Sequence, residues 1–371
     1  MRFGRRMRLR ALVVLLLTTV LLYCWINLVP KPQRLDNRTY EILSKHANTN
    51  NGNSKALPDQ AARELCDIYG WNVYRRPDNS PRKVYDLFLI NTELDWFEIR
   101  INELDQHVDY FVVAEAKTTF TGRPKPLALN ATWDRFEKFH HKIIYHQVEG
   151  RGENEKTPWD HERFQRSSLL NQVFPKLEGK QKPQLGDVIL VSDIDEITRP
   201  ETMALLRTCD YPRRVNLRSR FYYYSFQWLH RGPDWNHPQA TYYEGKHTIE
   251  PEDLRMGVGG QLLHNWFGAK ADIWNAAWHC SSCFSTIQEM QFKIQAFSHT
   301  IWDRPEFKDP PQVVRRVRNG LDLFDRPREK YDRVENNQDV PSFLKKNYEK
   351  FSYMLNRDPE NANFRDYVPP Q

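Results

Sequence analysis

The sequence lacks the glycine-rich loops with which many enzymes bind phosphate groups. It contains 15 glycines among 371 residues, yet none of them complete a G-x-G-x-x-G or a G-x-x-x-x-G-K-[ST] pattern. This absence argues against a P-loop nucleotidase and against a dinucleotide-dependent enzyme. Internal repeats are also missing from the sequence.

A general excess of positive charge is missing from the body of the chain. The formal net charge is +6, but residues 1–34 alone hold seven basic residues and no acidic one. Residues 35–371 carry 47 basic and 48 acidic residues, a net charge of −1. This balance excludes a nucleic-acid binder that works through bulk charge.

Cysteine is scarce, with five residues in the whole chain. Cys24 lies in an apolar run, which leaves Cys66, Cys209, Cys280 and Cys283. An even number in an oxidising compartment allows two disulfides, in three possible connectivities. The C-x-x-C pair at 280–283 would also suit half a zinc site or a redox pair. No second pair has zinc-finger spacing, so disulfide bonding is the favoured interpretation.

One long apolar run is present at the N-terminus. Residues 11–29 (ALVVLLLTTVLLYCWINLV) hold no charge and follow the arginine-rich residues 1–10. A helix of this length spans roughly 28 Å, about one hydrocarbon thickness. The pattern predicts a cytosolic tail at 1–10, a single-pass signal anchor at 11–29 and a lumenal body. The alternative is a cleaved signal peptide, but an A-x-A-like site is absent before Pro30.

The segment after the anchor is polar and rich in turn-forming residues. We expect residues 30–80 to form a lumenal stem that is mobile at least through residue 58, and residues 81–371 to form the catalytic domain. Sequons at Asn37 and Asn130 agree with a lumenal, N-glycosylated body.

Apolar strand patterns alternate with helical patterns in the first half of the body. This alternation predicts a Rossmann-type, mostly parallel α/β sheet, in which ligands bind at the carboxyl ends of the strands. Beyond residue 210 aromatic, β-like segments predict a mixed C-terminal subdomain that forms the other wall of a cleft. The expected strands are 84–90, 108–116, 142–148 and 187–193, and the expected helices are 92–108, 131–140, 160–175, 200–208, 285–298 and 311–319.

In the stretch VILVSDIDEITRP (188–200), three carboxylates directly follow an apolar run that is typical of a buried strand. If the strand continues, Asp193 and Asp195 lie on one face, where they repel each other unless a cation lies between them. Mg²⁺ or Mn²⁺ with oxygen ligands would fill this role. The alternative is an ordinary solvated turn, but the position at the carboxyl edge of the sheet favours a site.

A membrane-anchored lumenal α/β domain with this D-x-D motif suggests a nucleotide-sugar glycosyltransferase of the GT-A type. The leaving nucleoside diphosphate gains negative charge as the sugar departs, and a metal held at the D-x-D can neutralise that charge.

Three blocks of sequence resemble glycosyltransferase family 17. They are DLFLINTELDWFEIRINELDQHVDYFVVAEAKTTFTGRPKPL (86–127), VILVSDIDEITRP (188–200) and WHCSSCF (278–284) with the following Phe292-Lys293. The resemblance covers about residues 84–320, and Thr198 departs from the proline that is usual in the family. It implies UDP-GlcNAc as donor, Mn²⁺, an inverting reaction, and a Golgi type II membrane protein. The implied acceptor is a glycan hydroxyl such as that of the β-mannose of an N-glycan core, which would receive a bisecting GlcNAc.

Metal binding and catalysis are expected from four residues. Asp195 would coordinate the metal, and Asp193 would hold the ribose or a metal-bound water. His299 is the candidate for completing the metal shell, although a structural histidine is the alternative. An inverting transfer also needs a general base, for which Glu289 ranks ahead of Glu244 and Asp272.

Donor and acceptor contacts are expected from seven further residues. Each has a structural alternative: an acidic helix cap, a surface ion pair, or a disulfide-pinned turn at WHCSSCF. The donor-side candidates are Asn91, Glu93, Arg163, Arg166 and Lys293, and the acceptor-side candidates are Trp278 and His279.

Two other classes of protein compete with this interpretation. One is a lumenal glycan-binding or scaffold protein on an inactive transferase fold, against which the intact D-x-D argues. The other is a glycoside hydrolase, which needs two carboxylates at a glycosidic bond and no metal-bound nucleotide.

Overall fold

A computed structural model describes residues 18–19, 33–47, 57–150, 152, 155–258 and 270–369. The anchor predicted at 11–29 lies outside these residues except for Thr18 and Thr19. Among the residues described, no helix is both long and apolar enough to span a bilayer.

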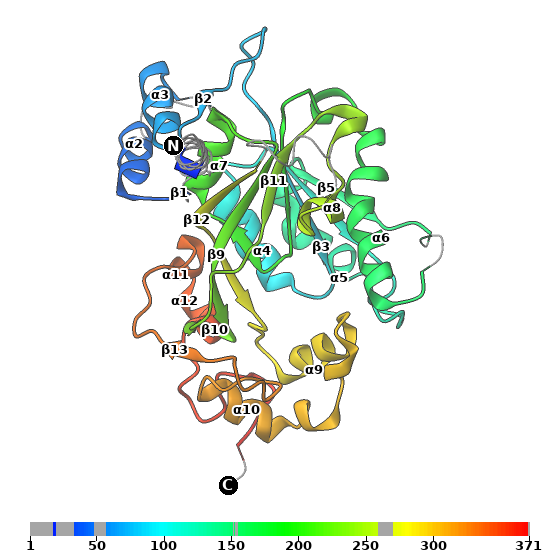
Figure 1. Cartoon of the computed structure of the whole chain (residues 1–371). Helices are drawn as coiled ribbons and strands as arrows, with labels where there is room; N and C mark the ends of the chain where they lie inside the picture. The colour runs from blue at the N-terminus through cyan, green and yellow to red at the C-terminus, as the bar shows by residue number, and fades with distance from the viewer. Residues whose placement is uncertain are drawn as a thin grey trace, which may run out of the picture.

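Four parallel strands form one half of the central sheet (Figure 1). They are β3 (Val84–Ile90), β4 (Tyr110–Glu115), β5 (Ile143–Gln147) and β6 (Val188–Ser192), in the order β6-β3-β4-β5. Their apolar side chains are almost all buried because both faces of a parallel sheet are covered. The four strands and the parallel pairing predicted from the sequence are confirmed.

The other half of the sheet is mixed. β11 (Gln239–Tyr242) runs antiparallel to both β6 and β9 (Arg214–Tyr223), and β12 (Lys270–Ser281) runs parallel to β9. This confirms the mixed part expected beyond residue 210. The shorter strands of this half are β1 (Gln33–Arg34), β7 (Glu196–Thr198), β10 (Ser225–His230) and β13 (Tyr331–Arg333).

Helices cover both faces of the sheet. α4 (Leu94–Leu104) and α7 (Pro200–Thr208) pack on one face, and α6 (Pro158–Asn171) and α8 (Pro251–Arg255) contribute to the core on the other. α6 begins before the predicted residue 160, with a capping box in which Thr157 is the N-cap and Asp160 caps from inside the helix. The helix expected near 131–140 is instead α5 (Ala128–Ala131) followed by a 3₁₀ segment, Trp133–Phe139.

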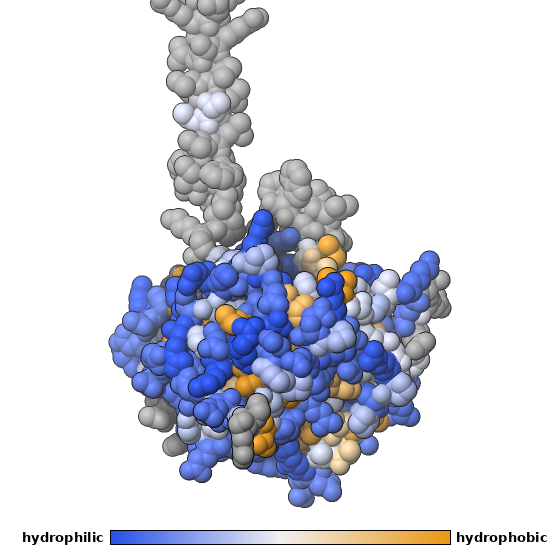
Figure 2. Space-filling model, turned by 90° about the horizontal axis from the view of Figure 1, so that it is seen from below, coloured by the Kyte–Doolittle hydropathy of each residue, from blue (hydrophilic) through white to orange (hydrophobic). Residues whose placement is uncertain are grey.

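A second lobe lies below the sheet in Figure 1. It contains α9 (Ile287–Ala296) and α10 (Pro310–Arg318), both close to the predicted bounds, and has its own core around Trp228, Met290 and Val313. Figure 2 shows this lobe from below as mainly hydrophilic, with small, separated hydrophobic groups. The remaining elements are α11 (Ser342–Lys346), α12 (Tyr348–Phe351) and 3₁₀ turns at Phe174–Lys176, Gly179–Gln181, Gly245–His247, Thr300–Trp302, Pro305–Phe307 and Ser352–Met354.

The region predicted as a stem carries regular elements that pack on the body. β1 pairs with β12, and the helices α2 (Asn37–Ala47) and α3 (Asp59–Ile68) lie beside α7 (Figure 1). A short sheet of β2 (Asn72–Val73) and β8 (Cys209–Asp210) continues this attachment. The polar composition misleads here because a few apolar residues at helical spacing, including Leu65, are fully buried.

Two disulfides select one of the three connectivities left open by the sequence. Cys66 bonds with Cys209, and Cys280 bonds with Cys283. The first joins α3 to the end of α7. The second pins the turn after β12, as expected for WHCSSCF.

Candidate active site

The D-x-D motif forms a tight turn at the carboxyl end of β6. The strand ends at Ser192, and the amide of Glu196 donates to the carbonyl of Asp193 at 3.1 Å. The Glu196 carboxylate in turn accepts from the amide of Asp193 at 2.9 Å. The prediction that strand periodicity places Asp193 and Asp195 on one face is therefore wrong, because the strand stops before either residue. Asp193 and Asp195 thus lie in a turn, which is the alternative interpretation of the motif. This turn lies at the carboxyl edge of the sheet, where the sequence predicts a site.

A fully buried arginine holds this turn from behind. Arg100, on α4, forms a two-pronged ion pair with Asp86 of β3 at 2.6 and 2.7 Å. Its remaining nitrogen donates to the carbonyls of Asp193, Ile194 and Glu196 at 3.2, 3.4 and 2.8 Å. Both side chains are 0% exposed. The planar guanidinium thus fixes the turn by contacts that a lysine could not reproduce.

Two more arginines neutralise the carboxylates of Asp193 and Glu196 in this turn. Arg255 of α8 contacts Asp193 at 2.5 Å and Glu196 at 2.8 Å, and Arg166 of α6 contacts Asp193 at 3.3 Å. Burial opposes ionisation of Asp193, but the charges of Arg255, Arg166 and Lys293 together outweigh it and lower the pKa. The pKa of Glu196 is lowered further, against its burial, by the charge and hydrogen bonds of Arg255. Both carboxylates are therefore ionised and paired.

Asp195 differs from Asp193 and Glu196 because none of the arginines that the structure describes pairs with it. Burial, together with the neighbouring carboxylates, raises its pKa to about 7 against the opposing charge of Lys293. The Nε2 of His279 lies 3.8 Å from the carboxylate. Burial lowers the pKa of His279 to about 4. This imidazole is neutral, and its buried Nδ1 has no hydrogen-bond partner among the described residues.

Lys293 and Glu93 connect the end of β3 to α9 across the site. The Lys293 Nζ lies 3.5 Å from the Glu93 carboxylate. Burial alone would lower the pKa of Lys293, but the charges of Glu93 and Asp195 raise it. Glu93 also accepts from the amides of Asn91 and Thr92 at 3.0 and 2.9 Å. The side-chain oxygen of Asn91 is buried and has no hydrogen-bond partner within the described ranges. The structure thus brings Asn91, Glu93 and Lys293 together near the D-x-D turn.

The charged network around the turn has a surplus of negative charge. Six carboxylates face three basic side chains, and both histidines beside it, His237 and His279, have lowered pKa values. The carboxylates are Glu93, Glu162, Asp193, Asp195, Glu196 and Glu252, and the basic side chains are Arg166, Arg255 and Lys293.

A divalent cation fits this surplus at Asp195. A buried carboxylate without a cationic partner gains most from a hard cation with oxygen ligands. In the part of the chain that the structure describes, no three His, Cys, Asp or Glu side chains form a ready ligand set. The oxygens of Asp193 are taken by arginines, so Asp195 is the better ligand of the two, and other oxygens would have to come from water or substrate.

Several predicted site residues lie outside this network or at its margin. Arg163 is exposed on α6, whereas Arg166, three residues on, is buried. His299 packs edge-on against Trp159 at 4.7 Å. Trp278 faces the opposite side of β12 from His279, where its ring nitrogen donates to Asp339 at 3.0 Å. The two predicted acceptor-side residues therefore lie on opposite sides of β12, and only His279 lies beside the D-x-D turn.

Glu289 is the clearest correction among the predicted site residues. Its carboxylate accepts from the amides and hydroxyls of Ser285 and Thr286 at 2.8–3.1 Å, which closes the capping box of α9. A carboxylate occupied in this way serves the helix end and is poorly disposed to act as a base. The other two base candidates are paired with arginines, Glu244 with Arg213 and Asp272 with Arg218.

Replacing Glu289 with glutamine tests this correction. We expect a loss of about 1 kcal/mol in the free energy of unfolding, because a capping contact is weakened. The turnover number should stay within about threefold of wild type, whereas loss of a general base lowers it by about 10²-fold or more. Urea unfolding and steady-state kinetics give the two values, and a large loss of turnover without loss of stability would restore Glu289 as the base.

Sequence reasoning missed Arg100, Asp86 and Arg255. The signal for Asp86 is one acidic residue inside the apolar run VYDLFLI. The signal for Arg100 is a basic residue within an otherwise apolar helical face. Arg255 gives no local signal, because its partners lie about 60 residues away in the sequence.

The α/β sheet and the acidic turn at its carboxyl edge agree with the glycosyltransferase class expected from the sequence. The chain belongs to glycosyltransferase family 17, whose sequence profile matches residues 6–360.

Comparison with curated proteins gives relatives at modest identity. β-1,4-Mannosyl-glycoprotein 4-β-N-acetylglucosaminyltransferase of Rattus norvegicus is 26% identical over 324 residues, which cover 77% of this chain and 57% of the relative. The Homo sapiens protein of the same name is 26% identical over 314 residues, covering 75% and 56%. The chain thus spans little more than half the length of these relatives. Among solved structures, mannosyltransferase PcManGT from Pyrobaculum calidifontis in complex with GDP-Man and Mn²⁺ aligns with a TM-score of 0.32 and 11% identity, over 76% of this chain and 74% of that one.

Proposed function

We propose that this chain transfers N-acetylglucosamine from UDP-GlcNAc to a hydroxyl of an N-glycan, with inversion at the sugar and with Mn²⁺ or Mg²⁺ as cofactor. The observation that carries the proposal is Asp195, a buried carboxylate at the carboxyl edge of a parallel sheet that forms no ion pair with a described arginine or lysine. The names of the curated relatives supply the donor sugar and the acceptor.

Each charged residue has a proposed part in binding the donor. The cation, bound by Asp195, would supply positive charge to the diphosphate as it leaves. Lys293 adds a second positive charge on the α9 side, and Glu93 holds it in place. Asn91 offers a buried side-chain oxygen to the nucleoside. Arg166 and Arg255 keep Asp193 ionised and fixed, which orients the turn.

The cellular setting is proposed from the sequence. Residues 11–29 would anchor the chain as a single-pass type II protein of the Golgi membrane, with residues 30–371 in the lumen. Both sequon asparagines, Asn37 and Asn130, are exposed, as N-glycosylation requires. The two disulfides also suit an oxidising compartment.

Release of UDP tests the proposal directly. The full chain, purified from a secretory host, is incubated with UDP-GlcNAc, UDP-Gal, UDP-Glc or GDP-mannose, with Mn²⁺ or EDTA, and with or without an N-glycan mixture. We expect release from UDP-GlcNAc that requires Mn²⁺ and rises with the glycan. Release from another sugar nucleotide would overturn the donor, and release that persists in EDTA would overturn the metal.

The same experiment separates the two rival functions. A glycan-binding scaffold would release nothing and would bind no donor in calorimetry. A glycoside hydrolase would cleave the glycan itself without any nucleotide, and chelation would leave it active.

A further inference from the structure

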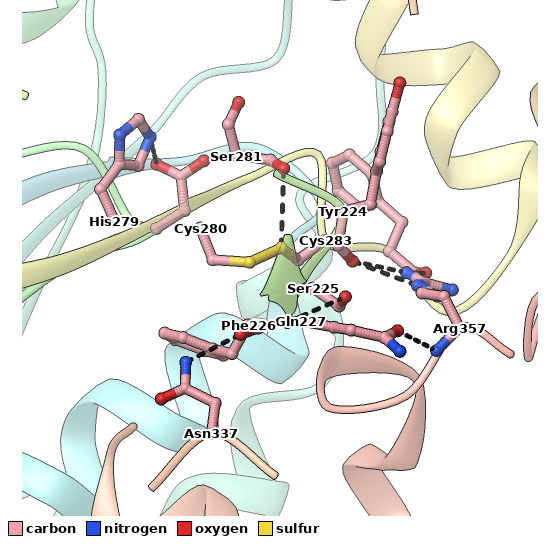
Figure 3. Close-up of a disulfide and its surroundings, with 12 residues drawn as sticks. Tyr224, Ser225, Phe226, Gln227, His279, Cys280, Ser281, Cys283, Asn337 and Arg357 are labelled. Carbon is pink, nitrogen blue, oxygen red and sulfur yellow. Dashed lines mark hydrogen bonds and ion pairs between the residues drawn. A yellow bond between two sulfur atoms is a disulfide. The ribbon is translucent and has the colours of Figure 1, made fainter. Parts of the chain in front are cut away.

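One row of side chains crosses the sheet from the D-x-D turn toward β9. β12 pairs with β7 on one side and with β9 on the other, so His279 lies between Glu196 and Phe221. The His279 and Phe221 rings stack with centroids 4.8 Å apart and planes 13° apart. Figure 3 shows His279 just before the disulfide-pinned turn that ends β12.

Trp235, in the loop between β10 and β11, packs against the rings of this row. Its amide and carbonyl both bond with Ser219 of β9 at 2.9 Å, which fixes the backbone. Its ring lies 5.6 Å from Phe221 and 5.1 Å from His279. Its indole nitrogen donates to Glu196 at 2.7 Å. The tryptophan is thus attached rigidly to the charged network.

Phe221 and Trp235 differ from the other aromatic residues of this region in their accessibility. Tyr222, Tyr224 and Trp228 are 1%, 0% and 7% exposed and belong to the two cores. Phe221 and Trp235 are only partly buried. Rings that remain accessible on rigid backbone, next to a charged site, are suited to binding a flat apolar surface.

We propose that Phe221 and Trp235 form a platform on which a pyranose ring of the acceptor glycan stacks. The proposal rests on the proposed function and names the part of the site that would bind the acceptor. A pyranose presents C–H groups on one face and hydroxyls at its rim. Stacked on the platform, its apolar face covers the two rings while its rim reaches His279, which lies 3.8 Å from Asp195.

The position of the charges favours the acceptor over the donor as the occupant. The diphosphate of a donor needs positive charge, and Lys293 lies on the α9 side of the turn. The platform itself consists of two uncharged rings, and its neighbour on the sheet is the stacked ring of His279. A neutral sugar residue is the ligand that gains from this surface.

The test compares glycan binding with donor binding in ring variants of the full chain. Phe221→Ala and Trp235→Ala remove one aromatic side chain each, whereas Trp235→Phe keeps a smaller aromatic ring and loses the indole nitrogen that donates to Glu196. Trp159→Ala is the matched control, because Trp159 is 47% exposed and contacts His299 instead of the platform. A free N-glycan core oligosaccharide is the probe, and saturation-transfer NMR in the presence of UDP and Mn²⁺ measures its binding.

Loss of either ring is expected to weaken glycan binding and raise the acceptor KM by on the order of tenfold or more. The affinity for UDP measured by calorimetry should stay within about twofold. Trp235→Phe should retain most of the glycan affinity, and Trp159→Ala all of it. Thermal unfolding identifies any variant that fails to fold. If the alanine variants do not fold, Trp235→Phe alone tests the platform, because a loss of glycan affinity with an aromatic ring still present would contradict stacking.

Three outcomes would overturn the platform. They are unchanged glycan affinity in both alanine variants, a loss of UDP affinity instead of glycan affinity, and a wild-type chain that binds no glycan. Because glycan binding is measured without turnover, the affinity for the glycan can be determined even if the proposed donor or reaction is wrong. Failure of the proposed function is then distinguishable from failure of the platform.

Discussion

Replacing Asp195 with asparagine is expected to abolish sugar transfer and, in the absence of metal, to make the folded protein more stable. The ordinary pKa of an aspartate is 3.8, and burial raises that of Asp195 to about 7. Between these two values the folded chain keeps a proton that the unfolded chain has lost. Stability therefore falls as pH rises from about 4 to 7, and the full penalty is present above pH 7. Three pH units correspond to about 4 kcal/mol, so we expect the variant to gain about 2–4 kcal/mol at pH 8.

Urea unfolding at pH 4 and pH 8, with EDTA and with Mn²⁺, measures this prediction. The difference between variant and wild type should be small at pH 4 and largest at pH 8 in EDTA. Mn²⁺ should stabilise the wild type and have little effect on the variant, because the cation binds only the native site. Asp134→Asn is the control, since Asp134 is an exposed residue outside the network.

Two results would contradict this account of Asp195. Equal stability of variant and wild type at pH 8 would mean that the carboxylate is not a buried, uncompensated charge. Transfer at the wild-type rate would remove the D-x-D turn from the mechanism. Loss of transfer by a factor of 10² or more, together with the gain in metal-free stability, fits a residue that is retained for function at a cost in stability.

The sequence predicts the parallel half of the sheet well because each strand there is a continuous apolar run. Val188–Ser192 and Val84–Ile90 are buried on both faces, so their composition alone identifies them. The edge at which the site lies then follows from the direction of the strands. Pairing between distant segments has no such local signal: β1, at residues 33–34, joins β12 at residues 273–274.

The roles of individual site residues are harder to predict, since they depend on partners from elsewhere in the chain. Asp193 and Asp195 look alike in the sequence. In the structure Arg166 and Arg255 pair with Asp193, and neither of them pairs with Asp195. Glu289 is a different case. Thr286 and Glu289 form an S/T-x-x-E pattern, which predicts a capping box from local sequence alone. Its capping role was therefore accessible without the structure.

Replacing Arg100 with methionine is expected to cost about 3–5 kcal/mol of unfolding free energy and to abolish transfer. The variant leaves the carboxylate of Asp86 buried without a counter-charge, which is the larger part of the cost. It also removes the donors to the carbonyls of Asp193 and Glu196. Arg135→Met is the matched control from an exposed pair with Glu98, 35% and 17% accessible, where a loss below about 1 kcal/mol is expected.

The double variant Asp86→Leu with Arg100→Met separates the two roles of this arginine. Replacing both partners of a buried ion pair with apolar residues is often neutral or stabilising, so much of the unfolding free energy should return. The carbonyls of the D-x-D turn would still lack their donors, and transfer should remain low. Urea unfolding and UDP release measure the two effects on the same protein. Recovery of both would mean that Arg100 only balances the charge of Asp86, whereas recovery of stability alone would show that it positions the turn that carries Asp195.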